Sequence, residues 1–184
     1  EEHVLRVELG TSDALAVDDV AHFVLPGEEM VRVLHVSHSE GFLDRALATD
    51  EKVRVTHLTP DAMAMADLDR YDVMLFDGVP MLLPPDADLA GKGVACLGCP
   101  VADPPELVPA RLDGIIDTAE VVDWAESHPL LRFSGAFDLR MLQLVNATER
   151  PGAEVLIRSR EGVVASLDDE NMTRSLFFAV SADP

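Results

Sequence analysis

The stretch that decides the fold is residues 31–47, VRVLHVSHSEGFLDRAL. Its first part, 31–36, is mostly apolar and too short for an ordinary helix, which predicts a buried strand. Residues 37–39 form a polar turn, and the apolar positions over 42–47 follow helical spacing, with Ser39 predicted to cap the helix. In an open α/β sheet, a turn that follows the carboxyl end of a strand lies where ligands usually bind.

Strand and helix patterns alternate downstream of this stretch. Residues 53–58, VRVTHL, predict a second strand, and Pro60 opens a short helix predicted to run through Met65. The apolar runs 71–77 and 93–98 predict strands buried on both faces of a parallel sheet. The prolines between these two runs disfavour the usual crossover helix.

The two ends of the chain are rich in strand patterns. In the back third, 139–144, 155–160, 163–167 and 175–180 predict strands of an antiparallel extension, and 112–122 predicts one or two more. At the front, 3–9 and 20–25 also predict strands. We expect residues 1–29 to be the terminal strands of a preceding β domain or an edge hairpin, and residues 30–184 to form the main α/β domain.

Composition excludes some classes of function. The 184 residues carry 34 acidic and 14 basic side chains, a formal net charge of −20. Such a charge repels nucleic acid and anionic lipid, so neither is expected as a partner. The two cysteines are too few for a disulfide scaffold. No apolar run reaches the roughly 18 residues that span a bilayer.

Four segments together carry a resemblance to a known family: 13–26, DALAVDDVAHFVLP; 31–47; 69–80, DRYDVMLFDGVP; and 121–131, VVDWAESHPLL. Their succession resembles the class I glutamine amidotransferase-like domain of bacterial membrane-anchored proteins of the von Willebrand factor A, aerotolerance type. The resemblance implies a flavodoxin-like, mainly parallel sheet flanked by helices. It also implies a location on the extracytoplasmic side of a bacterial membrane, periplasmic or at the cell surface, with membrane contact only through other segments.

The catalytic motif of that family is incomplete in this sequence. A class I amidotransferase needs its cysteine on a tight elbow between small residues. The corresponding stretch is 94–98, VACLG, in which Val94 replaces a glycine and Pro100 follows closely. No histidine follows His128, so the histidine and glutamate of a triad are missing. We therefore predict no catalytic residue and no cofactor.

The candidate binding site is the rim where the predicted strands end: Ser37, His38, Asp77, Gly78 and Cys96. Asp77 alternatively caps its own turn. Cys96 and Cys99 form a C-x-x-C pair, for which burial at a strand end is set against a nucleophile, a redox pair or half of a zinc site. No metal site is predicted, and calcium at Asp18-Asp19 or at 168–170 lacks properly spaced ligands.

Four other side chains receive a structural interpretation, and for two of them a functional one stays open. His35 and His57 fit packed positions on the sheet, although together with His38 they could also cluster. Trp124 is interpreted as an aromatic anchor, with His128 capping a short helix at Pro129.

Two functions are weighed. The first is a non-catalytic interaction domain of a larger membrane-anchored protein, binding a protein partner or neighbouring domains of the same chain. The second is a small-molecule-binding or hydrolase domain using the rim at Ser37, Asp77 and Cys96, which requires a concave pocket there. A sugar-related protein of the trehalose-utilisation type shares the general fold but leaves residues 1–29 unexplained.

Overall fold

The computed structural model describes residues 3–8, 20–25, 30–132, 140–169 and 172–182. The chain divides into two compact units, Glu1–Met30 and Val31–Pro184. In the first unit, β1 (His3–Glu8) and β2 (Val20–Leu25) pair as an antiparallel two-stranded sheet. The predicted strands in these two places are confirmed. That residues 1–29 close a preceding β domain stays a prediction.

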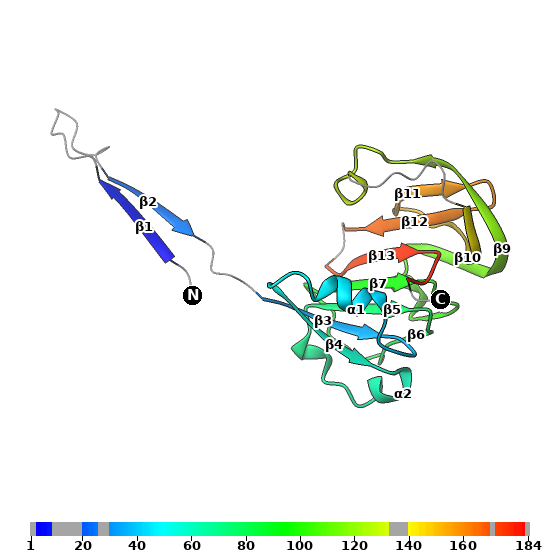
Figure 1. Cartoon of the computed structure of the whole chain (residues 1–184), viewed down its shortest axis with the longest axis horizontal. Helices are drawn as coiled ribbons and strands as arrows, with labels where there is room; N and C mark the ends of the chain where they lie inside the picture. Colours follow the sequence, from blue (N-terminus) through cyan, green and yellow to red (C-terminus); the bar gives the residue numbers. More distant parts are fainter. Residues whose placement is uncertain (1–2, 9–19, 26–29, 133–139, 170–171, 183–184) are drawn as a thin grey trace. The chain divides into compact units, whose positions relative to one another are not determined.

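The second unit is built on a nine-stranded sheet in the order β10-β9-β11-β12-β13-β7-β5-β3-β4 (Figure 1). Its strands are β3 (Val31–Val36), β4 (Val53–Leu58), β5 (Val73–Asp77), β7 (Gly93–Leu97), β9 (Ala110–Trp124), β10 (Arg140–Glu149), β11 (Glu154–Ser159), β12 (Val163–Asp168) and β13 (Arg174–Phe178).

The parallel half of the sheet consists of β13, β7, β5, β3 and β4. Within this half, β3 and β5 both have neighbouring strands on each side. Leu34, Val36, Met74 and Phe76 are all fully buried there, and complete burial of one such side chain contributes about 1.5–3 kcal/mol. The prediction of buried parallel strands at these positions is confirmed.

The antiparallel half begins at β13, which pairs parallel with β7 on one side and antiparallel with β12 on the other. β12, β11, β9 and β10 then continue the sheet with antiparallel pairing. The predicted antiparallel extension is therefore present, but a mainly parallel sheet was the wrong prediction. The nine-stranded sheet has four antiparallel and four parallel strand pairings, because each hairpin in the back third contributes directly to the same sheet.

Helices are few among the described residues. They are α1 (Phe42–Leu47), α2 (Pro60–Met63) and the short 3₁₀ turns Leu68–Arg70, Pro105–Leu107 and Pro129–Leu131. The chain thus has an α/β fold with a large mixed sheet and little helical cover. Between β5 and β7 there is no helix. That segment contributes β6 (Met81–Leu82), which pairs with β8 (Ala102–Asp103).

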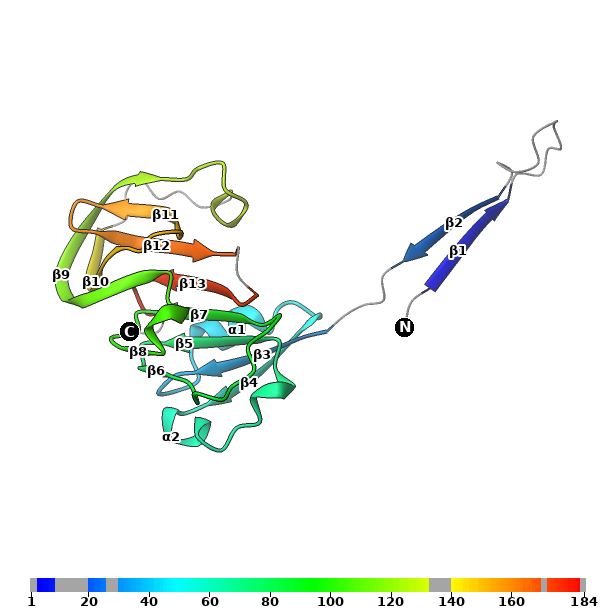
Figure 2. The same ribbon diagram turned by 180° about the vertical axis from the view of Figure 1, so that it is seen from behind.

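The two views show what covers the parallel half. Helix α1 lies on one face of the sheet, and the β6–β8 pair lies on the other (Figures 1 and 2). None of the helices in the described part of the chain has the length and apolar character needed to cross a bilayer.

The start of α1 differs from the prediction. Its N-cap is Gly41, two residues after Ser39, and the Asp44 side chain reaches back to the backbone of this N-cap residue. The Oδ2 atom of Asp44 accepts a hydrogen bond from the Gly41 backbone N–H at 2.8 Å. This is one half of a capping box, since glycine has no side chain to complete the other half. Helix α2 ends at Met63, two residues earlier than predicted.

Candidate functional site

The carboxyl ends of β3, β5 and β7 form one side of a cavity of about 610 Å³. This volume is within the range of small-molecule sites. The other side comes from β9, β10 and the segment after β13. The cavity is lined by Ser37, His38, Ser39, Asp77, Gly78, Gly98, Ile115, Asp117, Gln143, Leu144, Val145, Ala179, Val180 and Ser181.

Four of the five predicted rim residues line this cavity: Ser37, His38, Asp77 and Gly78. The fifth, Cys96, is not among the lining residues, and its side chain is only 1% exposed. The physical reason is that Cys96 lies inside β7, before its last residue, and packs in the hydrophobic core, whereas Gly98, just beyond the strand end, reaches the cavity.

The polar side chains of the cavity include two carboxylates, one amide, several hydroxyls and the imidazole of His38. Asp77 and Asp117 supply carboxylates, Gln143 supplies an amide, and the serines supply hydroxyls. Among the described lining residues there is no lysine or arginine. The cavity therefore favours ligands with hydrogen-bond donors or positive charge over anions.

Asp77 closes β5 and holds the C-terminal segment. Its Oδ1 accepts hydrogen bonds from Ser181 Oγ at 2.6 Å and from the Ala182 backbone N–H at 2.9 Å. Burial alone raises the pKa of Asp77, but the nearby His35 imidazole and the hydrogen bonds from Ser181 and Ala182 outweigh it and lower the pKa below the usual value. Asp77 is therefore an ionised carboxylate that fastens residues 181–182. It does not cap its own turn by these bonds.

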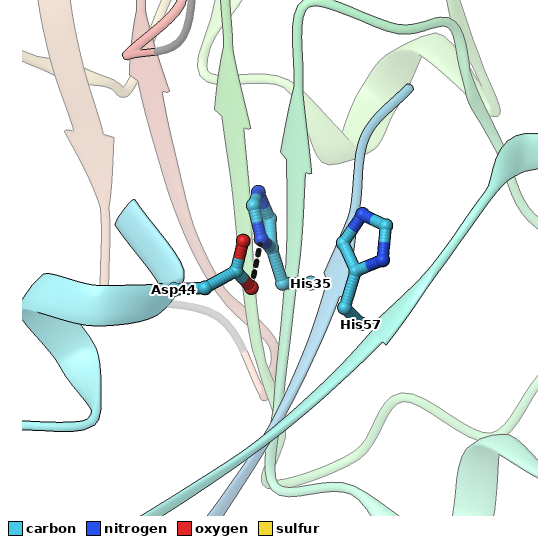
Figure 3. A group of neighbouring side chains, drawn as sticks. All are labelled: His35, Asp44 and His57. Atoms are coloured by element: carbon cyan, nitrogen blue, oxygen red, sulfur yellow. Dashed lines mark hydrogen bonds and ion pairs between the residues drawn. The ribbon is translucent and has the colours of Figure 1, made fainter. Parts of the chain in front are cut away.

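His35 lies between two carboxylates and is fully buried. Its Nδ1 is 2.7 Å from Asp44 Oδ1 and its Nε2 is 3.9 Å from Asp77 Oδ2 (Figure 3). Desolvation lowers the pKa of His35, but the negative charges of Asp77 and Asp44 and the hydrogen bond with Asp44 outweigh it and raise the pKa above 6.5. His35 is thus more than a packing residue, because it links α1 to the carboxylate at the end of β5.

His57 contacts the cavity through Ser37. Its Nε2 is 2.9 Å from Ser37 Oγ, and the same Oγ donates a hydrogen bond to the Ser39 carbonyl at 2.7 Å. A serine hydroxyl has one proton. Because the Ser37 hydroxyl donates this proton to the Ser39 carbonyl, His57 Nε2 is the donor in its hydrogen bond with Ser37 Oγ. His57 therefore does not act as a base toward Ser37. In this arrangement Ser37 has no base that accepts its proton.

Both cysteines are free and buried. Cys99 donates from Sγ to the Phe76 carbonyl at 3.6 Å. Burial, together with the neighbouring Cys96, strongly raises the pKa of Cys99. A neutral buried thiol is neither a nucleophile nor a metal ligand. The interpretation of the pair as buried residues at a strand end agrees with this geometry.

Trp124 and His128 lie where the structural interpretation places them. Trp124 packs partly buried against the core, and His128 Nδ1 accepts a hydrogen bond from the Leu130 backbone N–H at 3.3 Å. His128 is the N-cap of the turn Pro129–Leu131. Of the calcium candidates, Asp18-Asp19 and Glu170 lie outside the described residues.

Sequence reasoning missed several residues of this region. Asp117, Gln143 and Ser181 were not predicted, because they come from elements whose position depends on the whole sheet. Asp44 was not predicted either, although it lies on the predicted helix that directly follows β3. One signal was present in the sequence. β3 and β4 share the pattern V-R-V-x-H, and the parallel register pairs His35 with His57. Matching these two strands indicates that the two histidines lie side by side.

Comparisons with known proteins support the fold. No protein-family model matches the sequence, and no curated protein matches it. Two solved structures of cytoplasmic proteins from Salmonella typhimurium are similar, each with a TM-score of 0.64, 15% identity, 84% of this chain covered and 89% of theirs. A candidate GMP synthase protein from Thermoplasma acidophilum aligns at 9% identity with a TM-score of 0.41, over 80% of this chain and 82% of its own.

These comparisons correct one expectation and leave another without support. The similar Salmonella proteins are named as cytoplasmic, which points against the predicted extracytoplasmic location. The prediction followed from the resemblance to membrane-anchored proteins, carried by short segments. Nothing in the comparisons supports the von Willebrand factor A, aerotolerance-type relationship.

Proposed function

We propose that this chain is a non-catalytic small-molecule-binding domain of glutamine amidotransferase-like architecture, which binds its ligand in the cavity beside Ser37 and Asp77. The observation that carries the proposal is the cavity itself. It has about 610 Å³ of space, and polar side chains from several strand ends converge on it.

The lack of amidotransferase chemistry is part of the proposal. Cys96 is buried outside the cavity lining, and Ser37 already donates its proton to a backbone carbonyl. A nucleophile needs access to substrate and a base to take its proton. Neither residue meets both requirements.

The charge of the site defines the ligand class. Asp77 and Asp117 line the cavity, and the chain as a whole carries a formal charge of −20. Phosphates and carboxylates are repelled by this field. A polyol, a sugar or an amine matches the serine hydroxyls, the amide and the carboxylates. A protein partner or neighbouring domain stays a prediction of the sequence.

A blocking substitution tests the proposal. Ser39 lines the cavity and is exposed, so Ser39→Trp fills the cavity without removing a core contact. Ser127→Trp is the matched control, because Ser127 is exposed and does not line the cavity. The measurement is the Tm of each chain with millimolar polyols, monosaccharides or primary amines, and with inorganic phosphate.

We expect at least one neutral or cationic compound to raise the Tm of the wild type and of Ser127→Trp, because a ligand that binds only the folded state stabilises it. Ser39→Trp should show no rise, and phosphate should give none in any chain. The proposal fails if no compound raises the Tm or if Ser39→Trp responds like the wild type. Ammonia release from glutamine that Cys96→Ser abolishes would overturn its non-catalytic part.

A further inference from the structure

Three side chains that sequence reasoning assigned to no metal site meet behind the cavity. His35 comes from β3, His57 from β4 and Asp44 from α1. One nitrogen of each histidine and one carboxylate oxygen all lie within 4.8 Å of one another. Figure 3 shows His35 between Asp44 and His57.

The fold brings these groups together by two independent routes. The parallel register of β3 and β4 places His35 directly opposite His57, so both imidazoles lie on the same face of the sheet. Asp44 is in the first turn of α1 on that face, where the Gly41 backbone N–H holds its Oδ2 at 2.8 Å. The other oxygen, Oδ1, is then directed at His35.

We propose that His35, Asp44 and His57 bind a divalent transition-metal ion of the Zn²⁺ type. Two imidazoles and one carboxylate are a donor set suited to Zn²⁺, and three protein ligands leave a fourth position for water. Calcium and magnesium prefer oxygen ligands throughout.

The surroundings of His35 supply a second observation. Its Nε2 faces Asp77 Oδ2 at 3.9 Å, and both atoms are buried with no other hydrogen-bond partner among the described residues. A histidine that binds a metal through one nitrogen characteristically directs its other nitrogen at a carboxylate, which fixes the ring. The unpaired carboxylate oxygen of Asp77 is placed for this role once His35 Nδ1 binds an ion.

The ion would require small movements. Zn–N and Zn–O bonds of about 2.0–2.2 Å put tetrahedral ligand atoms roughly 3.3 Å apart. His35 Nδ1 and Asp44 Oδ1 are now 2.7 Å apart and would separate to admit the ion. His57 would turn from Ser37 toward the other two ligands. The side chain of Asp44 is 16% exposed, so the group is open to solvent on the α1 side.

The test is Zn²⁺ binding by the full chain after removal of metal with a chelator. Binding is measured by calorimetry with ZnCl₂, and Co²⁺ substitution reports tetrahedral geometry through its visible absorption. His57→Ala removes one ligand and keeps the His35–Asp44 pair. His38→Ala is the matched control, because His38 is exposed and outside the group.

We expect one Zn²⁺ per wild-type chain and per His38→Ala chain, and a loss of affinity of more than 10-fold in His57→Ala and Asp44→Asn. Circular dichroism of each variant shows whether it is folded. The proposal is overturned if the wild type does not bind Zn²⁺ stoichiometrically, or if folded His57→Ala binds like the wild type. Neither result depends on the ligand of the cavity, so this proposal and the preceding one fail separately.

Discussion

At the scale of single residues, the most constrained group is His35. It is fully buried and has a carboxylate on each side, at 2.7 Å from Asp44 and 3.9 Å from Asp77. A buried charge without partners would cost several kcal/mol, which these carboxylates offset. The sequence showed only that a histidine interrupts an apolar strand. Its partners could not be predicted, because they come from α1 and from the end of β5.

The raised pKa of His35 predicts how stability changes with pH. The folded state holds the proton more tightly than the unfolded state, so the stabilisation is complete below about pH 6.5 and is lost as the pH rises through the folded-state pKa. We expect the free energy of unfolding, measured with urea in the presence of a chelator, to fall between pH 6 and 8. In His35→Gln the free energy of unfolding should change less steeply with pH over this range. Equal slopes in the two chains would contradict the raised pKa.

At the scale of elements, the strands of the second unit were largely predictable and the connections were not. Residues 53–58 form β4 with the predicted bounds, because the segment is rich in β-branched residues and no glycine or proline interrupts it. The cap of α1 was misplaced, since Ser39 is a strong N-cap residue but its carbonyl accepts a hydrogen bond from Ser37. The cavity could be predicted only on its β3–β5 side, because β9 and β10 reach it through long-range pairing.

Gly98 provides a test of how β7 meets the C-terminal segment. Its φ is +59°, and a Cβ there would lie 2.5 Å from the Ser181 backbone nitrogen. Gly98→Ala should therefore cost the left-handed strain of about 1–2 kcal/mol together with a backbone clash. Gly91→Ala is the control, because its φ is +76° and nothing lies within 4 Å of the added atom. Urea unfolding should show a clearly larger loss for Gly98→Ala, and equal losses would refute the close approach.

At the scale of the whole molecule, charge is the dominant property. The formal net charge is −20, and it is spread over a chain with few compensating ion pairs among its described residues. Self-repulsion of this size destabilises a compact state. The composition predicted this property without any knowledge of the fold, because it depends on residue counts alone.

Salt should therefore stabilise the chain. Raising the ionic strength from about 0.01 to 0.15 M shortens the Debye length from about 30 to 8 Å, which screens repulsion between distant carboxylates. We expect the Tm to rise over this range, measured by differential scanning calorimetry. Tetramethylammonium chloride should act like sodium chloride, since screening does not depend on the identity of the cation. A constant or falling Tm would contradict this account.

The position of β13 has a consequence for how the chain is made. β7 is complete at Leu97, yet its partner on the outer side begins at Arg174, about 80 residues later. During synthesis on the ribosome, β4, β3, β5 and β7 can assemble first, leaving the edge of β7 with unpaired backbone groups. An open, apolar edge of this kind invites pairing with other nascent chains. Premature termination before residue 174 would thus release an aggregation-prone fragment. The pairing of β13 with β7 is therefore the step that covers this edge and protects the newly synthesised chain from aggregation.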